Sequence, residues 1–362
     1  MCANSTSFPR YMHGKKNQMP IVIVGGIVST GRSAKRERRA PVTPEDLTWF
    51  GDRFRAVATN IERVIQGKRD SIELVVTSLI SEGHVLIEDV PGVGKTLLAK
   101  SLAKSIDCRF QRIQFTPDLL PSDITGVSVW NRERGSFFFR AGPVFTNILL
   151  GDEINRASPK TQAALLEAME ERQITVDGET RNLEAPFMVV ATQNPIEHEG
   201  TYPLPEAQLD RFMMRVRMGY PDRAKELEML QTHGEHSSFV DLKPVVHAED
   251  VIRMASIARS VHVAEVLRMY LISLAEATRS HPDILLGASP RATLFLQRAA
   301  RTNAAADGRD YASPDDVKVI ITPVLNHRLI IRPEAQMRGR TVDAILTEIT
   351  DSVPVPGTRP PI

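Results

Sequence analysis

The sequence predicts an α/β domain built on a parallel sheet, followed by a smaller all-α domain. Up to residue 220, apolar runs of strand length alternate with segments of helical periodicity. The runs are His84–Glu88, Ile148–Gly151 and Phe187–Ala191, and the helical segments cover 95–106 and 159–171. Buried strands separated by helices are typical of a parallel sheet that is covered on both faces.

The strand signals fade after Gly219-Tyr220-Pro221. Beyond this point the helical segments are 222–231, 248–259, 263–279, 290–306 and 314–330, several of them with Ser-Pro starts. We therefore expect an α/β domain over 43–221, a helical domain over 222–350 and a flexible tail over 351–362.

Composition limits the class of protein. The 362 residues are 42% hydrophobic, and the two cysteines cannot form a disulfide framework. The longest apolar stretch, Ile21–Val28, is far shorter than the roughly 20 residues of a membrane span. The first 40 residues hold eight basic residues and one acidic residue, so the net charge of +1 leaves −6 for the rest. We expect residues 1–42 to be a disordered basic leader and the protein to be cytoplasmic.

The α/β domain is expected to begin with a helix at Thr43-Pro44-Glu45, where an N-cap residue precedes proline and an acidic first turn. Two β-hairpins interrupt the strand–helix alternation. The first lies between Asp123 and Arg140 around a polar turn, and the second lies between Arg172 and Pro186 around Asp177-Gly178. Aromatic residues of the first hairpin, Trp130 and Phe137–Phe139, would either grip a client protein or pack the hairpin down.

The segment VPGVGKT at Val90–Thr96 lies between a predicted strand and a predicted helix, which is the order of a P-loop. Glycines allow backbone N–H groups to surround phosphates at a helix N-terminus. Lys95 would reach the β- and γ-phosphates of ATP, and the Thr96 hydroxyl would bind Mg²⁺. Asp89 stands where the usual P-loop pattern begins with glycine, and aspartate tolerates a turn there.

Polar side chains follow directly after two more predicted strands. Asp152 and Glu153 follow one strand, and Asn194 follows the next. Ligands of open α/β sheets bind at the carboxyl ends of the strands. Asp152 would hold Mg²⁺ through water, Glu153 would polarise the attacking water, and Asn194 would orient that water. The alternative for Asp152 and Glu153 is a pair of solvated acids at a strand end. The alternative for Asn194 is a turn residue before proline.

Four segments together resemble the MoxR family of AAA+ ATPases: VPGVGKT, LLGDEINRASPKTQAALLEAMEER, ATQNPIEHEGTYPLPEAQLDRF and GASPRAT. The resemblance covers about residues 44–350. It implies an AAA+ P-loop domain with a helix-2 insert and a pre-sensor-1 hairpin, followed by a helical lid. It also implies Walker A at Gly92, Gly94, Lys95 and Thr96, Walker B at Asp152 and Glu153, and sensor 1 at Asn194. The expected ATP contacts are Asp89, Val90, Pro91, Gly92, Val93, Gly94, Lys95, Thr96 and Leu97.

The resemblance assigns two catalytic arginines. Arg211 matches an arginine finger, which stabilises charge on the ATP of a neighbouring subunit. Arg156 is a rival for that role, and a surface pair with Asp210 is the alternative for Arg211. Arg291, at a Ser-Pro helix start, matches sensor 2 and would clamp the γ-phosphate, unless it is a plain solvated arginine.

The sequence thus predicts an ATPase that uses ATP and Mg²⁺ and assembles into a ring, for which we expect a hexamer. The resemblance implies chaperone-like remodelling or maturation of partner proteins, some of which carry von Willebrand factor A domains. A DNA-associated motor is the alternative enzyme, although the net charge of −6 after the leader argues against it. A nucleotide-gated scaffold is a third possibility, and it would lack Glu153 or the arginine finger.

Overall fold

The computed structural model describes residues 42–194, 201–221, 223–224, 226–227 and 239–355. The chain divides into two units, Met1–Ala40 and Pro41–Ile362, and the described residues all belong to the second. The expected leader, apart from residue 42, lies outside the described residues, as does the tail from residue 356. The expected helix over 222–231 lies largely outside them too.

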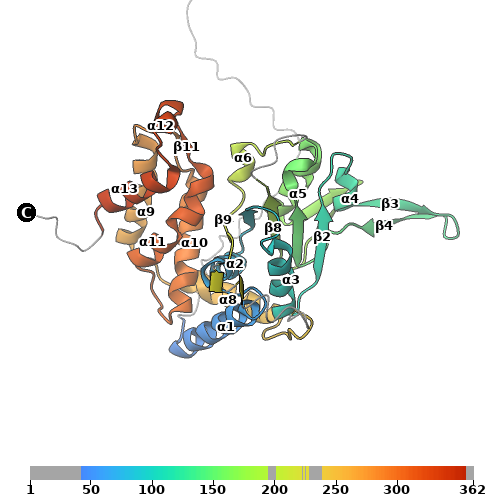
Figure 1. Ribbon diagram of the computed structural model, residues 1–362. Helices are drawn as coiled ribbons and strands as arrows, with labels where there is room; N and C mark the ends of the chain where they lie inside the picture. Colours follow the sequence, from blue (N-terminus) through green and yellow to red (C-terminus); the bar gives the residue numbers. More distant parts are fainter. Residues whose placement is uncertain (1–41, 195–200, 222, 225, 228–238, 356–362) are drawn as a thin grey trace, which may run out of the picture. The chain divides into compact units, whose positions relative to one another are not determined.

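A five-stranded parallel sheet forms the centre of the α/β part, with the strand order β2-β5-β8-β1-β9 (Figure 1). The strands are β1 Val85–Glu88, β2 Phe110–Gln114, β5 Ile148–Asp152, β8 Met188–Gln193 and β9 Met214–Val216. The three strands expected from the sequence are confirmed as the central ones. The sequence prediction missed β2 and β9, the two edge strands, because β2 is half exposed and polar and β9 has only three residues.

Alternating side chains of the central strands enter two separate cores. Val85 and Ile87 of β1 join one apolar cluster, whereas Leu86 between them joins the other. The first cluster includes side chains of α1 Pro44–Glu62, α2 Arg69–Ile80 and α3 Lys95–Ser105, and the second includes those of α5 Pro159–Glu171. Because successive strand residues point to opposite faces, this division places α5 and α1–α3 on opposite faces of the sheet.

The first helix begins as its sequence indicates. The Thr43 side chain accepts a hydrogen bond from the backbone N–H of Asp46, the Asp46 carboxylate reaches back to Thr43, and Pro44 occupies the first turn. This reciprocal arrangement is a capping box.

Both expected hairpins are present. The first consists of β3 Gly126–Asn131 and β4 Ser136–Ala141, which pair from Gly126↔Ala141 to Asn131↔Ser136. It follows the short helix α4 Pro121–Thr125 and projects away from the sheet (Figure 1). The second consists of β6 Gln173–Val176 and β7 Glu179–Asn182, joined at Asp177-Gly178. Asp-Gly at that place provides the positive φ that a tight hairpin turn needs.

In the described residues 239–355, the regular secondary structure is helical apart from one short two-stranded antiparallel sheet. Its helices are α8 Ala248–Ser260, α9 Glu265–Ser280, α10 Pro290–Ala306, α11 Pro314–Leu325, α12 Pro333–Met337 and α13 Val342–Ser352. The expected helix over 314–330 is too long, because α11 ends at Leu325. A 3-10 turn, Asn326–Arg328, follows, and β11 Ile330–Ile331 then pairs with β10 Ile284–Leu286. Within the part of the chain that is described, no helix has the length and apolar character needed to cross a membrane.

Candidate functional site

Three polar segments lie at the carboxyl edge of the sheet, at the ends of adjacent strands. Asp89 follows β1, Asn194 follows β8, and Asp152-Glu153 lies at the end of β5. The backbone N–H of Asp89 donates to the carbonyl oxygen of Gln193 at 3.3 Å, which continues the pairing of β1 with β8. The sequence-predicted residues of all three segments are therefore brought to one edge.

The loop Val90–Thr96 connects β1 to the first turn of α3, which begins at Lys95. Gly92 and Gly94 have φ angles of +86° and +91°, a left-handed conformation that side chains with a Cβ rarely adopt. The Lys95 ammonium donates to the carbonyl oxygen of Asp89 at 2.5 Å, across the mouth of the loop. A glycine-rich loop with a lysine at a helix N-terminus can bind phosphate groups.

Asp89 has a structural role that the sequence did not reveal. One carboxylate oxygen accepts the backbone N–H of Val90 at 2.8 Å. The other accepts the N–H groups of Met218 and Gly219 at 2.7 and 2.6 Å. The Asp89 carboxylate therefore ties the start of the loop to the segment that leaves β9.

Asp152 is largely buried, with 12% of its side chain exposed. Its Oδ2 accepts from the Arg112 guanidinium, with Nη2 at 2.7 Å and Nε at 3.1 Å. Its Oδ1 accepts from the Thr192 hydroxyl at 2.5 Å. These contacts fix the orientation of the carboxylate expected to bind the metal.

Glu153 adopts a left-handed backbone conformation, with φ at +57°. Such a φ in a residue other than glycine is uncommon and is typical of functional sites. Its backbone N–H donates to the Thr192 hydroxyl at 2.9 Å. Its Oε2 accepts from the Gln114 amide at 2.7 Å and pairs with Arg156 Nε at 3.0 Å. The carboxylate is thus held by two side chains of its own chain.

Asn194 is buried, with 5% of its surface exposed, at the end of the strand between β1 and β5. Sequence reasoning missed the groups that hold Asp152 and Glu153, which are Arg112 and Gln114 of β2 and Thr192 of β8. A signal for the first two exists in FQRIQ at 110–114, where they alternate with buried Ile113 and so share one face of a strand.

Arg211 and Arg291 lie at the opposite, amino edge of the sheet. Arg211 comes shortly before the first residue of β9, and both guanidinium groups pair with Glu170 in the last turn of α5. That helix follows β5 and runs back along the sheet. Near its end, the carbonyl oxygen of Met169 accepts a hydrogen bond from Nε2 of His84 at 3.0 Å, and His84 comes just before β1, so this end of α5 lies at the amino edge. We refer to Arg211 and Arg291 as the arginine pair.

The three arginines with predicted roles do not lie together. Arg291 lies at the edge opposite the P-loop of its own chain, and its expected clamp on a γ-phosphate stays a prediction. Arg156 pairs with Glu153 at the carboxyl edge of its own chain. Arg211 and Arg156 therefore lie at opposite edges of the sheet.

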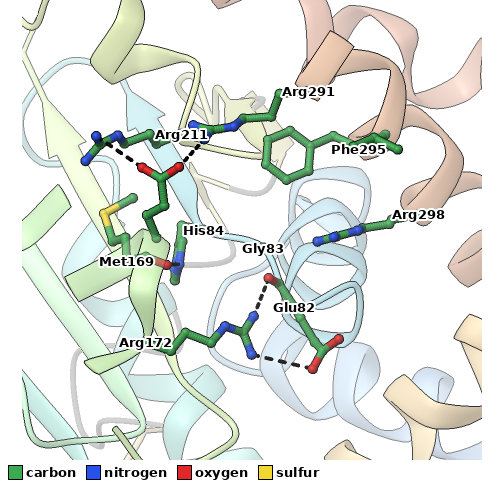
Figure 2. A pocket seen from close by; sticks show the side chains of 11 residues that line it. Glu82, Gly83, His84, Met169, Arg172, Arg211, Arg291, Phe295 and Arg298 are labelled. Carbon is green, nitrogen blue, oxygen red and sulfur yellow. Dashed lines mark hydrogen bonds and ion pairs between the residues drawn. The ribbon is translucent and has the colours of Figure 1, made fainter. Parts of the chain in front are cut away.

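A cavity of about 230 Å³ opens beside the arginine pair. Figure 2 shows the guanidinium groups of Arg211 and Arg291 directed toward one carboxylate, with Arg298 facing the same space. The ion pairs identify this carboxylate as that of Glu170. Arg172 lies at the other end and donates to the carbonyl oxygen of Glu82 at 2.7 Å. Guanidinium groups thus dominate the charged lining of this cavity.

Asp210 joins the chain segments that carry the two arginines. Its carboxylate accepts from the Ser289 hydroxyl at 2.9 and 3.0 Å, and Ser289 is the N-cap of α10, which carries Arg291. Nε of Arg328, whose side chain is 2% exposed, donates to the same carboxylate at 2.7 Å. Burial lowers the pKa of Arg328 to about 10, while Asp210 favours its charged form.

The residues at the carboxyl edge suit ATP with Mg²⁺. Magnesium prefers oxygen ligands, which the Thr96 hydroxyl can supply directly and the Asp152 carboxylate can supply through bound water, and it usually takes the remainder from phosphates and water. The left-handed backbone at Gly92 and Gly94 and the ammonium of Lys95 suit a triphosphate. Among the described residues no group of three or more His, Cys, Asp or Glu forms a metal site, and a phosphate-bound Mg²⁺ requires none.

A parallel sheet with a glycine-rich loop after one central strand and acidic residues after another is the architecture of P-loop ATPases. Residues 84–214 match the ATPase family associated with various cellular activities (AAA), and residues 276–349 match the AAA lid domain. The class of protein is therefore an AAA ATPase with its lid.

Similar proteins narrow the class. The chain is 50% identical over 300 residues to the uncharacterized protein YeaC of Bacillus subtilis, covering 83% of this chain and 94% of that one. It is 41% identical over 305 residues to chaperone MoxR1 of Mycobacterium tuberculosis, with 82% and 80% covered. It is 31% identical over 336 residues to protein MoxR of Methylorubrum extorquens, with 86% and 97% covered. A crystal structure of a candidate ATPase from Cytophaga hutchinsonii has a TM-score of 0.80 and 40% identity, with 86% and 97% covered. The chain belongs to the MoxR family of AAA+ ATPases.

Proposed function

We propose that this protein hydrolyses ATP at sites shared between subunits of a ring. The observation that carries the proposal is the separation of two groups of residues to opposite edges of one sheet. The phosphate-binding loop lies at the carboxyl edge, and the arginine pair lies at the amino edge. Arginines so placed would act on ATP held by another copy, and head-to-tail contacts of this kind form a ring when the rotation between copies closes.

Within one subunit, each residue at the carboxyl edge has a distinct task. Lys95 would release the Asp89 carbonyl oxygen and bind the β- and γ-phosphates, while Thr96 and Asp152 would hold Mg²⁺, which neutralises phosphate charge. Glu153 would accept the proton of the attacking water on its carboxylate, and Asn194 would orient that water. The Gln114 and Arg156 contacts with Glu153 would have to loosen for this step.

From the neighbouring subunit, Arg211 would stabilise the charge that develops on the γ-phosphate. Such a contact accelerates phosphoryl transfer by about 10³–10⁵ in related systems. Arg291 would act beside it, because both guanidinium groups already converge on a single carboxylate.

The cellular role we propose is chaperone-like remodelling or maturation of client proteins by a ring of six copies in the cytoplasm. The name of the mycobacterial relative, chaperone MoxR1, supports the role. The family resemblance suggests six copies and clients with von Willebrand factor A domains. The β3–β4 hairpin is the proposed client contact, since Trp130, Phe137 and Phe138 are 50%, 69% and 47% exposed.

The same hairpin also suits the alternative function, a DNA-associated motor. Exposed aromatic rings next to arginines can stack on the bases of single strands, and the hairpin turn carries Arg132 and Arg134. We favour protein clients because the chain after residue 40 is acidic overall. ATPase stimulation by single-stranded DNA, and not by a folded von Willebrand factor A domain, would reverse this preference.

Two experiments test the proposed ATPase. Glu153→Gln is expected to bind ATP normally and to hydrolyse it at least about 100-fold more slowly, because the amide cannot accept the proton. Lys95→Ala, which cannot bind ATP, is then mixed with Arg211→Ala, which can. Each should be inactive alone, and the mixture should recover ATPase activity that rises with protein concentration. The same mixing with Arg156→Ala tests the rival finger.

A further inference from the structure

We propose that Glu170 is the positioning residue for the arginine pair, holding both guanidinium groups in the arrangement that a neighbour's γ-phosphate requires. The inference rests on the proposed ring ATPase and adds a residue to its shared site. Its starting point is that one carboxylate serves both arginines, with its Oε2 3.1 Å from Nη2 of Arg211 and its Oε1 paired with Nη2 of Arg291 (Figure 2).

Two guanidinium groups directed at the same place repel each other unless an anion lies between them. The carboxylate of Glu170 is that anion in the free subunit. Each arginine contacts Glu170 through one terminal nitrogen, and a guanidinium has five N–H donors, so donors remain for phosphate oxygens. Glu170 can therefore keep the arginine pair converged while a phosphate binds.

The backbone that carries Glu170 is itself fixed. The neighbouring carbonyl oxygen of Met169 accepts from Nε2 of buried His84 at 3.0 Å. Nδ1 of His84 accepts the backbone N–H of Val189 at 3.0 Å, which anchors the ring between strand and helix. On the other side, Arg172 donates to the carbonyl oxygen of Glu82. A carboxylate on so rigid a support can define the position of side chains that reach it.

The backbones of the two arginines are fixed separately by Asp210, which binds the Ser289 hydroxyl and buried Arg328. What remains free is the direction of the long side chains, of which 30% and 37% of the surface is exposed for Arg211 and Arg291. Glu170 supplies that direction. A long, half-exposed arginine that must meet a phosphate depends on such orientation, since a displacement of about 1 Å can slow a reaction 10²-fold.

The test places the substitution on one side of the shared site at a time, in the full-length protein. In the reference mixture, Lys95→Ala subunits supply arginines and Arg211→Ala subunits supply bound ATP. Adding Glu170→Ala to the Lys95→Ala subunits should lower kcat of the mixture about 10- to 100-fold, with KM for ATP unchanged. Adding Glu170→Gln there should give an intermediate kcat, because one oxygen still accepts a hydrogen bond.

Adding Glu170→Ala instead to the Arg211→Ala subunits should leave the mixture as active as the reference, because those subunits supply no arginine pair to the active sites. This placement controls for folding and assembly, which the substitution would impair equally on either side. Glu171→Ala on the Lys95→Ala subunits is the matched surface control, since Glu171 is the next residue of α5 and is exposed. It should leave activity unchanged.

The outcomes separate the two claims. A reference mixture with no activity at any concentration would overturn the ring ATPase and Glu170 with it. An active reference mixture that Glu170→Ala leaves unchanged, stimulates, or impairs equally on both sides would overturn the positioning role alone.

Discussion

Restoring the missing glycine of the P-loop pattern is expected to damage this protein. The substitution is Asp89→Gly, which brings the loop to the usual pattern of residues. Asp89 is not among the residues with positive φ, whereas Gly92 and Gly94 are, so the conformation at position 89 does not require glycine. The carboxylate, by contrast, accepts three backbone N–H groups, at 2.6 to 2.8 Å.

The expected loss of stability follows from these bonds. A hydrogen bond to a charged group contributes about 1.5–3 kcal/mol, and a buried N–H left without a partner costs about 1–3 kcal/mol. Residue 89 is 9% exposed and the bond from Met218 is buried, so we expect a loss of about 2–4 kcal/mol in total. Glycine in place of another residue adds a smaller entropic cost. The melting temperature should fall by about 4–10 °C.

Thermal unfolding followed by circular dichroism measures this shift in the apo protein. Asp89→Asn keeps one carbonyl oxygen at the same place and should lose less than Asp89→Gly. Asp118→Gly, at an exposed position, serves as the matched control and should change the melting temperature little. If Asp89→Gly melts at or above the temperature of the unchanged protein, the anchoring role of the carboxylate is wrong.

Three other predictions concern separate parts of the molecule. Burial lowers the pKa of His84 to about 4, so between pH 6.5 and 4 the unfolded chain binds a proton that the folded protein does not. The free energy of unfolding therefore falls as pH falls, by about 2 kcal/mol at pH 5. Urea unfolding measures this loss, and the His84→Asn variant should not show it. Arg112→Ala should lower the Mg²⁺ concentration for half-maximal ATPase activity, because Arg112 no longer competes for Asp152; a raised requirement would contradict this. Replacing Trp130 and Phe138 with serine should leave basal ATPase activity and melting temperature unchanged while abolishing stimulation by a client, and a falling melting temperature would indicate packing instead.

The sequence predicted the features of this fold that depend on neighbouring residues. The capping box at Thr43, the turn at Asp177-Gly178 and the order of strand, loop and helix around Lys95 are local, and the structure contains all three. The central strands were predictable because they are buried on both faces and therefore continuously apolar. The edge strands lack that signal.

The contacts that the sequence did not predict join residues far apart in the chain. Glu170 meets Arg291 across 121 positions, and Asp89 meets Gly219 across 130. Arg291 itself was expected to clamp a γ-phosphate, and the sequence did not indicate that it would pair with Glu170. A Ser-Pro helix start predicts that α10 begins there, but it carries no information on which edge of the sheet that helix meets.

The strand β9 connects the two edges of the sheet, although it has only three residues. The chain enters it from Arg211 and Phe212 and leaves it toward Met218 and Gly219, whose N–H groups bind the Asp89 carboxylate. All three residues of β9 pair in parallel with β1, which fixes the position of β9 in the sheet. Arg211, the residue proposed to contact the neighbour's phosphate, is therefore joined through one paired strand and one carboxylate to the loop that would hold the subunit's own ATP. In a ring with shared sites, each loop would thus be linked mechanically to the nucleotide state of the adjacent site.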